Sequence, residues 1–410
     1  MSQDERMQVS SYSRFLEFII YILFFLGPLM GNVIMVLLHV LSQDFQVSIN
    51  AILIAIPAFM IPFAITQLFA GAISDIKGRI PVLIFGLLLF ALAMLTTTLS
   101  FNLEVFIISN ILAGIGFGFI NPVLIALMSD LTSPSMIPSK MGYLGATANL
   151  GVGIGPLIAS QMIGIGWRSV YILFFIITCF CLIYMFITKR PLKIISKGSN
   201  FKALMGQISN EMQKKVVILL LVTTFVYSHT YLAVTIWTSR TLAGVVEESL
   251  TGIILGLAGV GGAITGALAG NLIRKKGVRF TIFIGIVMMF FSMIVLITIG
   301  DITREVVSIP LAVGWIAGGF AGGILFTSMA YYSQVLSPER RGALAGLFTA
   351  SYFIGIALVP ITLSPFSDIF GITGVYIAIF FISIIYTLVI LILSKIASST
   401  ILNKEIQLNL

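Results

Sequence analysis

Long apolar runs separated by short polar breaks occupy most of the chain. Twelve of these runs are long enough to cross about 30 Å of hydrocarbon as an α-helix. Backbone polar groups inside a bilayer must be satisfied within the segment, and the alternating pattern of a membrane β-barrel does not occur, so we predict helices. The runs are approximately 15–40, 50–73, 81–100, 105–129, 140–165, 168–188, 216–240, 250–273, 280–300, 307–335, 343–366 and 372–396.

Basic residues are unevenly distributed over the polar breaks. If the N-terminus is cytoplasmic, 20 of the 23 Lys and Arg residues fall on the cytoplasmic side, and Arg168, Arg240 and Arg304 fall outside. Cytoplasmic loops of membrane proteins carry such an excess. We therefore predict a multi-pass protein of the cell (inner or plasma) membrane with both termini cytoplasmic. The first run has no small-residue cleavage site, which indicates a retained helix rather than a signal peptide.

Composition narrows the class of protein further. Of the 410 residues, 59% are hydrophobic and 9% are charged, against about 25% charged in a soluble domain. This excludes a cytosolic enzyme or a DNA-binding protein, and the net charge of +8 is explained by the lipid bilayer rather than by nucleic acid. Cys179 and Cys181 lie in one apolar run, and His39 and His229 are isolated, so we expect no metal site and no cofactor.

The second half of the chain resembles the first. Gly71 and Gly270 end corresponding runs, and Gly151 and Pro156 correspond to Gly355 and Pro360 at a constant offset. Further collinear pairs are Gly86 with Gly285, Ser133-Pro134 with Ser337-Pro338, and Gly142 with Gly346. The matches predict an all-α membrane protein of two pseudo-symmetric six-helix bundles, an organisation typical of transporters. We expect bundles at 1–188 and 216–396, a basic cytoplasmic linker at 189–215 and a cytoplasmic tail at 397–410.

A short polar turn between the second and third runs carries the most specific motif. Gly71 would permit close helix approach, Gly78 suits a left-handed helix cap, and Asp75 and Arg79 supply opposite charges. This segment resembles the signature loop of the major facilitator superfamily, and the resemblance extends over almost the whole chain. It implies a conformational latch, in which Asp130 at the end of the fourth run is a candidate partner for Arg79. A turn with solvated charges is the alternative.

A glycine-rich segment in the fifth run suggests a direction of transport. Gly151, Gly155 and Pro156 resemble the glycine-proline motif of the exporter branches of the superfamily, although Ala159 and Ser160 stand where two glycines are typical. Similar glycine runs elsewhere lie inside apolar spans with no strand before them, which excludes a nucleotide-binding loop. Leu26-Gly27-Pro28-Leu29, followed by Asn32 in the first run, resembles the start of bicyclomycin-resistance-type drug exporters, which belong to the twelve-helix drug/proton antiporters.

Ionisable groups that could couple transport to protons are few. Asn32 and Asn110 stand where many related exporters carry an acid and an arginine. His229 lies about halfway along the seventh run and can change charge near neutral pH, so it is the first candidate, with Asp75 as the second. A neutral histidine that only packs between helices is the alternative for His229.

The family resemblance also implies a central cavity lined by the first, fourth, seventh and tenth helices. Neutral polar and aromatic side chains on these helices suit a hydrophobic or weakly polar solute. The candidate lining residues are Asn32, Gln67, Asn110, Asn121, His229, Tyr231, Trp237, Trp315, Tyr331 and Gln334, with Tyr332 beside them.

Taken together, these features predict a secondary transporter, not an enzyme, that works by alternating access. We expect a monomer that exports a small hydrophobic compound in exchange for protons. The alternative is an uptake symporter or uniporter for a small metabolite such as a sugar or organic acid. A membrane enzyme would require a charged or metal-binding cluster inside the spans, and a sensor would require a soluble domain; the sequence shows neither.

Overall fold

The computed structural model describes residues 3–408 apart from 133–136, 188–200, 300–308 and 337–340. The described residues are almost entirely helical and form no β-sheet. The first half of the chain contains α1 (Gln3–Phe45), α2 (Ile49–Ile52), α3 (Ala55–Lys77), α4 (Arg79–Thr98), α5 (Leu103–Asp130), α6 (Ile137–Met162), the short 3₁₀ helix η1 (Ile163–Ile165) and α7 (Arg168–Ile187).

The second half contains α8 (Phe201–Met212), α9 (Lys215–Leu242), α10 (Glu248–Lys276), α11 (Val278–Ile299), α12 (Ile309–Val335), α13 (Arg341–Ala357) and α14 (Val359–Leu408). Of the expected linker 189–215, residues 189–200 lie outside the described residues, as do Ser133-Pro134 and Ser337-Pro338. Within the rest, α8 is a helix. The expected tail continues α14 as helix as far as Leu408.

The described helices supply twelve membrane crossings. Among the residues that the structure describes, eleven segments qualify as spans by length and composition, the last being Leu344–Ala397 with 54 residues. A straight helix of that length would measure about 80 Å, more than twice the hydrocarbon thickness. Gly371 interrupts α14 with φ 65° and ψ −168°, a conformation that glycine adopts at little cost. The chain reverses there, so this segment supplies two crossings, as the runs 343–366 and 372–396 predict.

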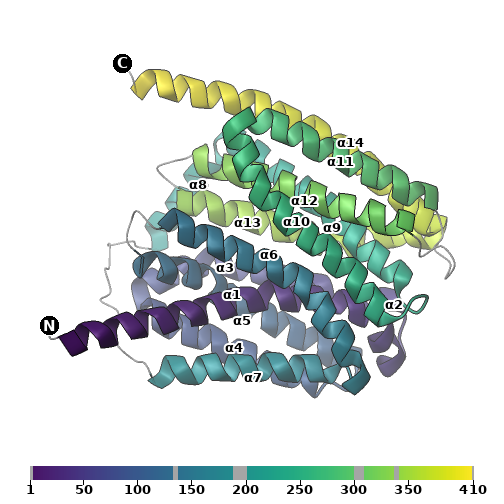
Figure 1. The fold of residues 1–410 in the computed structure, drawn as a ribbon, viewed down its shortest axis with the longest axis horizontal. Coiled ribbons are helices and arrows are strands. Elements are labelled where there is room, and N and C mark those ends of the chain that lie inside the picture. Colours follow the sequence, from purple (N-terminus) through teal and green to yellow (C-terminus); the bar gives the residue numbers. More distant parts are fainter. Residues whose placement is uncertain (1–2, 133–136, 188–200, 300–308, 337–340, 409–410) are drawn as a thin grey trace.

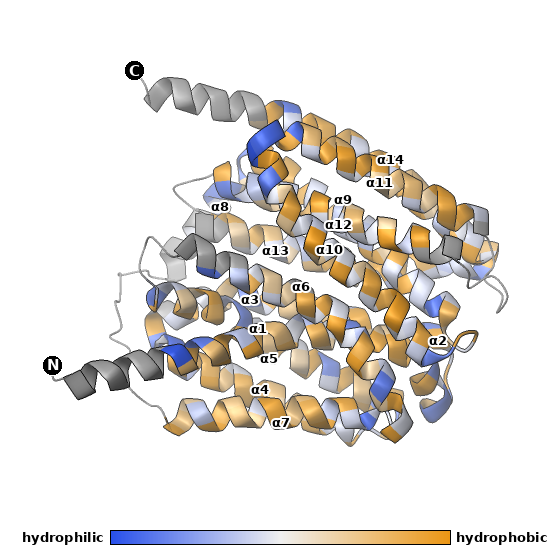
Figure 2. Ribbon diagram, in the orientation of Figure 1, coloured by the Kyte–Doolittle hydropathy of each residue, from blue (hydrophilic) through white to orange (hydrophobic). Residues whose placement is uncertain are grey.

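Figure 1 shows two bundles lying side by side, the first half in purple to teal and the second in green to yellow. Both chain ends lie at the same end of the molecule, which we call the terminal end, and the charge pattern predicts that it is cytoplasmic. The helix bodies are hydrophobic, and hydrophilic residues gather toward the helix ends (Figure 2). This distribution matches a protein whose middle is surrounded by lipid.

Close helix contacts repeat between the halves. A Cβ atom added to Gly114 of α5 would lie 2.2 Å from the carbonyl oxygen of Phe59 in α3. A Cβ added to Gly319 of α12 would lie 2.3 Å from the carbonyl oxygen of Ala258 in α10. Only glycine allows the backbones to approach this closely. The α3–α5 crossing is therefore reproduced as the α10–α12 crossing.

The next helix turn repeats the correspondence with side chains. Gly118 faces Thr66, whose Cβ would lie 2.6 Å from an added Cβ, and Gly323 faces Thr265, whose Oγ1 would lie 2.5 Å away. The number of residues from Gly118 to Gly323 is nearly the same as the number from Thr66 to Thr265. The sequence repeat is thus also a repeat of packing geometry.

A second repeated crossing involves the two glycines that the sequence pairs directly, one in each half. A Cβ on Gly151 would lie 2.6 Å from the carbonyl oxygen of Phe25, and one on Gly355 would lie 2.6 Å from that of Phe225. The first contact joins α6 to α1, and the second joins α13 to α9. Both halves therefore use the same two kinds of glycine crossing.

Adding a methyl group at these crossings tests their importance for stability. We expect Gly114→Ala and Gly319→Ala each to destabilise the protein by about 1–3 kcal/mol, because the new methyl meets a carbonyl oxygen that the helix cannot move easily. Gly270→Ala is the matched control, since in the described part of the chain a Cβ there has no neighbour within 4 Å. Thermal unfolding of the detergent-solubilised protein measures the effect. Equal midpoints for all three variants would contradict the interpretation.

Candidate functional site

The first contact between the halves is a seam of small residues where α6 meets α10. A Cβ on Gly259 would lie 2.5 Å from the Cα of Gly153, and one on Gly256 would lie 2.7 Å from the Leu157 side chain. One helix turn away, a Cβ on Gly252 would lie 2.8 Å from the carbonyl oxygen of Pro156. The two backbones are therefore in direct contact, so this seam constrains how the halves can move relative to each other.

The glycines of the predicted exporter motif divide between two faces of α6. Gly151 and Gly155 pack on α1, where a Cβ at Gly155 would lie 2.7 Å from the carbonyl oxygen of Leu29. Gly153, two residues from each, faces α10 of the other half. Gly151 and Gly155 thus pack α6 against its own bundle, and Gly153 packs it against the opposite bundle.

The second contact between the halves joins α3 to α13 and is aromatic. The rings of Phe63 and Phe353 meet edge to face with their centroids 4.5 Å apart. Such pairs contribute about 0.5–1.5 kcal/mol beyond their area burial. The two seams are related by the internal repeat, since α3 and α10 are corresponding helices, as are α6 and α13.

The signature loop at the terminal end forms the ion pair that its sequence predicts. Arg79 Nε lies 3.0 Å from Asp130 Oδ2, and Arg79 Nη1 donates to Ser74 Oγ at 2.6 Å. Gly78 has φ 95° and ψ 148°. Glycine adopts a positive φ at little cost, which explains why a glycine stands between α3 and α4. The Asp75 side chain lies outside the described residues. The role of the loop as a latch stays a prediction.

One expectation for this loop is wrong. Gly71 was expected to permit close helix approach, but a Cβ added there would have no atom of the described residues within 4 Å. The physical reason is that α3 meets α13 at Phe63, about two helix turns away.

At the opposite end, polar contacts join the halves directly. Arg240 Nε donates to Asn50 Oδ1 at 3.0 Å, and Asn50 Nδ2 donates to Asp368 Oδ1 at 3.2 Å. Ser239 Oγ also donates to the carbonyl oxygen of Met35. Asn50 and Met35 belong to the first half and their three partners to the second, so this end is closed by hydrogen bonds.

His229 lies at the junction of α9, α13 and α14. It is 6% exposed, and it is the only Asp, Glu, Lys, Arg or His buried inside a span among the residues that the structure describes. Nδ1 lies 2.9 Å from the carbonyl oxygen of Gly355, and Nε2 lies 3.0 Å from Thr362 Oγ1. Since a carbonyl oxygen only accepts, Nδ1 carries a proton.

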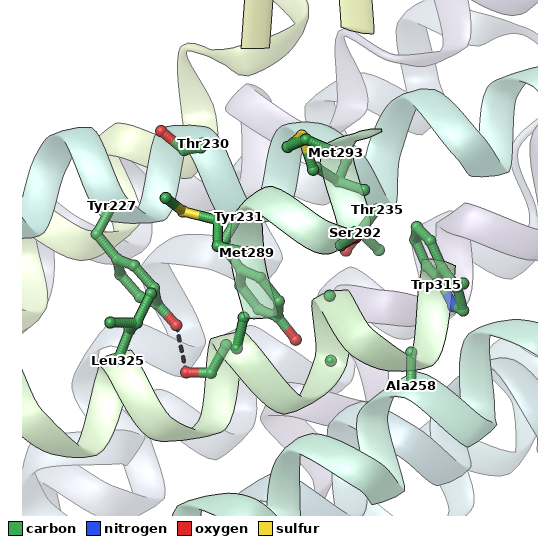
Figure 3. Close-up of a pocket in the computed structure, with 15 residues that line it drawn as sticks. Tyr227, Thr230, Tyr231, Thr235, Ala258, Met289, Ser292, Met293, Trp315 and Leu325 are labelled. Carbon is green, nitrogen blue, oxygen red and sulfur yellow. Dashed lines mark hydrogen bonds between the residues drawn. The ribbon is translucent and has the colours of Figure 1, made fainter. Parts of the chain in front are cut away.

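A pocket lies inside the second half, between α9, α10, α11 and α12 (Figure 3). Tyr231 and Trp315, two predicted cavity residues, line it together with Met289, Ser292 and Met293. It is narrow, with room inside for about two water molecules. No charged side chain lines it in the described part of the chain.

Other predicted cavity residues lie elsewhere. Asn32 Nδ2 donates to the carbonyl oxygen of Pro28, and Asn110 Nδ2 to that of Phe106, so each is satisfied by its own helix. Gln67 is buried, and its Nε2 has no partner among the described residues. The remaining predicted residues are outside the pocket lining: Asn121 on α5, Trp237 on α9, and Tyr331, Tyr332 and Gln334 near the terminal end of α12.

Two residues of interest were missed from the sequence. Ser292 lines the pocket from α11, and the signal that could have found it is a single hydroxyl in the apolar stretch between Thr281 and Thr298. Thr362 contacts His229 from a position 133 residues later in the chain, and no local pattern connects the two.

Twelve spans in two copied bundles, joined by two related seams, are the architecture of a membrane transporter. Residues 20–312 and 219–405 match the sequence pattern of the Major Facilitator Superfamily. The chain belongs to this family, whose members are transporters rather than enzymes.

Similar proteins include several drug-resistance proteins. The quinolone resistance protein NorA of Staphylococcus aureus (strain COL) is 24% identical over 371 residues, covering 88% of this chain and 92% of that protein. Multidrug resistance protein D of Escherichia coli (strain K12) is 28% identical over 144 residues, 34% of this chain. The matched stretch spans about a third of that relative (35%), and 28% of multidrug resistance protein 2 of Bacillus subtilis (strain 168).

Solved structures support the fold. The nucleoside transporter NupG superposes with a TM-score of 0.74 at 13% identity, covering 92% of this chain and 99% of that one. A POT family transporter in complex with 5-aminolevulinic acid gives a TM-score of 0.76 at 13% identity, covering 93% and 96%. At this identity the likeness concerns the fold alone.

Removing the charge of Asp130 tests the latch. An exposed pair contributes only about 0.2–1 kcal/mol to stability, so Asp130→Asn should change the thermal midpoint little. If the pair holds one conformation, transport by reconstituted protein should nevertheless fall several-fold. Glu104→Gln, at the opposite end of the same helix, is the matched control. Unchanged transport in Asp130→Asn would contradict a latch.

Shortening Asn50 tests the closure of the opposite end. Asn50→Ala removes both contacts to Arg240 and Asp368, so we expect that end to open more often. A single cysteine at Thr241, which faces a cleft beside Arg240, should then react faster with an impermeant maleimide. Asn102→Ala, at an α5 N-cap within the first half, is the control. The same labelling rate in Asn50→Ala and the parent would show that these bonds do not hold the halves together.

Proposed function

We propose that this transporter exports small, largely apolar compounds in exchange for protons, with His229 as the residue that carries the proton. The observation that carries the proposal is the pair of hydrogen bonds at the buried imidazole. Buried ionisable groups inside spans are costly and are generally functional.

The contacts of His229 accommodate both of its protonation states. In the neutral ring, Nδ1–H donates to Gly355 and Nε2 accepts the Thr362 hydroxyl proton. In the charged ring, Nε2–H donates to Thr362 Oγ1, whose own proton can turn to the carbonyl oxygen of Leu358 at 2.9 Å. Rotation of one hydroxyl therefore keeps every polar atom paired, which avoids the cost of a buried unsatisfied group.

The position of His229 relates its protonation to the packing of the surrounding helices. Gly355 lies at the close α9–α13 crossing, where an added Cβ would be 2.0 Å from Ser228 Oγ. The same helix α13 contacts the opposite half through Phe353. A change of charge on His229 would thus act on a helix that forms one of the two seams.

Export of apolar compounds is supported by the relatives and by the lining of the pocket. The proteins named for drug resistance include one that aligns with most of the chain. The pocket has an aromatic, methionine-rich lining without charge, which suits hydrophobic solutes. Asp75 remains the second candidate for proton coupling.

Proton movement in proteoliposomes tests the proposal. With pyranine trapped in an acidic lumen, acridone or ethidium should speed lumenal alkalinisation by the wild type. His229→Gln, which retains hydrogen-bonding capacity but cannot ionise, should reduce this flux to the level of protein-free liposomes. His39→Gln, the matched control, should retain it.

The same assay separates the alternatives. Compound movement without proton movement would overturn proton coupling and leave a uniporter. Protons that move in the same direction as a sugar or organic acid would favour an uptake symporter. Compound-driven flux that survives in His229→Gln would remove His229 from the mechanism and point to Asp75.

A further inference from the structure

A group of basic residues without acidic partners lies at the terminal end of the second bundle. All five members are exposed, and none forms an ion pair with a residue that the structure describes. Four of them surround the turn between α10 and α11, where Figure 2 shows hydrophilic residues, and the fifth lies on α14. We call this group the basic cluster, and its members are Arg274, Lys275, Lys276, Arg279 and Lys395.

The corresponding end of the first bundle carries acids that balance its basic residues. There Asp130 pairs with Arg79 at 3.0 Å. In the internal repeat, Arg274 stands in place of Asp75, and Gln334 stands in place of Asp130. The second copy has therefore lost both acids of this end, so its positive charge is open to a partner from outside the chain.

Arg279 connects two helices at the edge of this bundle. Its Nη2 donates to the carbonyl oxygen of Ser394 at 3.4 Å, which bridges α11 and α14 near the terminal end. The same two helices meet farther along through the rings of Phe290 and Phe380, whose centroids are 5.4 Å apart, and Figure 1 shows the helices side by side. Among the described residues Ser394 is the one partner of the guanidinium, which has five N–H donors. Most of these donors are therefore open to a ligand.

An exposed apolar face extends from the basic cluster toward the middle of the membrane. On α11, the exposed Phe283 lies one helix turn after Arg279. On α14, the exposed Leu388 and Ile392 stand seven and three residues before Lys395, which places all three on one side of the helix. The basic side chains thus lie where a phospholipid headgroup would be, and the apolar side chains lie where its acyl chains would be.

We propose that the basic cluster and this apolar face bind an anionic phospholipid of the leaflet at the terminal end, with its phosphate at Arg279 and Lys395. A guanidinium can donate two parallel hydrogen bonds to a phosphate. A zwitterionic phospholipid carries its own ammonium group, so a cluster with net positive charge favours an anionic one. The cluster includes the end of α10, which forms the seam with α6, so a bound headgroup would hold a helix that joins the halves. The site does not depend on which compound is exported.

A tryptophan beside the cluster tests the proposal by fluorescence quenching. Phe280→Trp places an indole at an exposed position next to Arg279, with the three native tryptophans changed to phenylalanine. The full chain is reconstituted in vesicles of equal parts phosphatidylglycerol and phosphatidylcholine, with brominated acyl chains on one lipid or on the other. Bromine quenches a neighbouring indole, and the two preparations have the same surface charge. We expect phosphatidylglycerol to be enriched about tenfold over phosphatidylcholine at this indole.

Changes of charge in this reporter protein locate the site. Arg279→Gln with Lys395→Gln should lower the enrichment about fivefold, which is the order of attraction that one basic side chain near the surface contributes. Arg279→Lys with Lys395→Arg keeps both charges and should retain the enrichment, which separates a loss of charge from a change in packing. Arg14→Gln with Lys77→Gln is the matched control, since it removes an exposed arginine and an exposed lysine at the terminal end of the first bundle. The control should leave the enrichment unchanged.

Three results would overturn the site. The first is equal quenching of the Phe280→Trp protein by the two brominated lipids. The second is an enrichment that the two glutamine substitutions at Arg279 and Lys395 leave unchanged, or that the control lowers equally, because either result indicates diffuse attraction to surface charge. The third is loss of the enrichment on addition of millimolar inorganic phosphate at constant ionic strength, which would assign the cluster to a soluble phosphate compound.

Discussion

Direct backbone contact at glycines is the constraint on which this structure depends. Inside a bilayer, association of helices gains little from the hydrophobic effect, so close packing must supply the attraction. Gly114, Gly319 and Gly153 each place a neighbouring helix where a methyl group would not fit. The same contacts fix how the helices cross within each bundle and how the bundles meet. They also limit the motion of the transporter to movements that such surfaces allow.

The seams and the polar contacts have different roles in this arrangement. The glycine seam of α6 with α10 and the aromatic seam of α3 with α13 join the bundles along their lengths. The hydrogen bonds around Asn50 close one end only. Rocking of the bundles about the seams would break the bonds at one end while the seams remain in contact. The placement of His229 beside α13 supplies a route by which a proton could bias that motion.

The sequence was sufficient for the fold and only partly sufficient for the site. Hydrophobic runs and paired glycines predicted the twelve spans, and Gly151 and Gly355 indeed occupy equivalent crossings. Arg79 and Asp130 form a pair because the turn after α3 and the end of α5 lie at the same end of the first bundle. By contrast, the Asn32 and Asn110 side chains donate to backbone carbonyl oxygens of their own helices. The direction in which these side chains point could not be predicted from the sequence. The pocket depends on how α11 packs against α12, and the His229–Thr362 contact depends on tertiary geometry, so neither followed from local pattern.

The central claim is that the two halves rock about fixed seams. Distances between the bundles test this claim most directly. Spin labels at Ile54 and Phe370 would report on the end opposite the termini, and labels at Ile76 and Lys275 on the terminal end, with Cys179 and Cys181 replaced by alanine. All four positions are exposed. Between neutral and acidic pH, the account predicts that one distance lengthens as the other shortens, by pulsed electron–electron double resonance. Two distances that stay constant, or that change in the same direction, would contradict it.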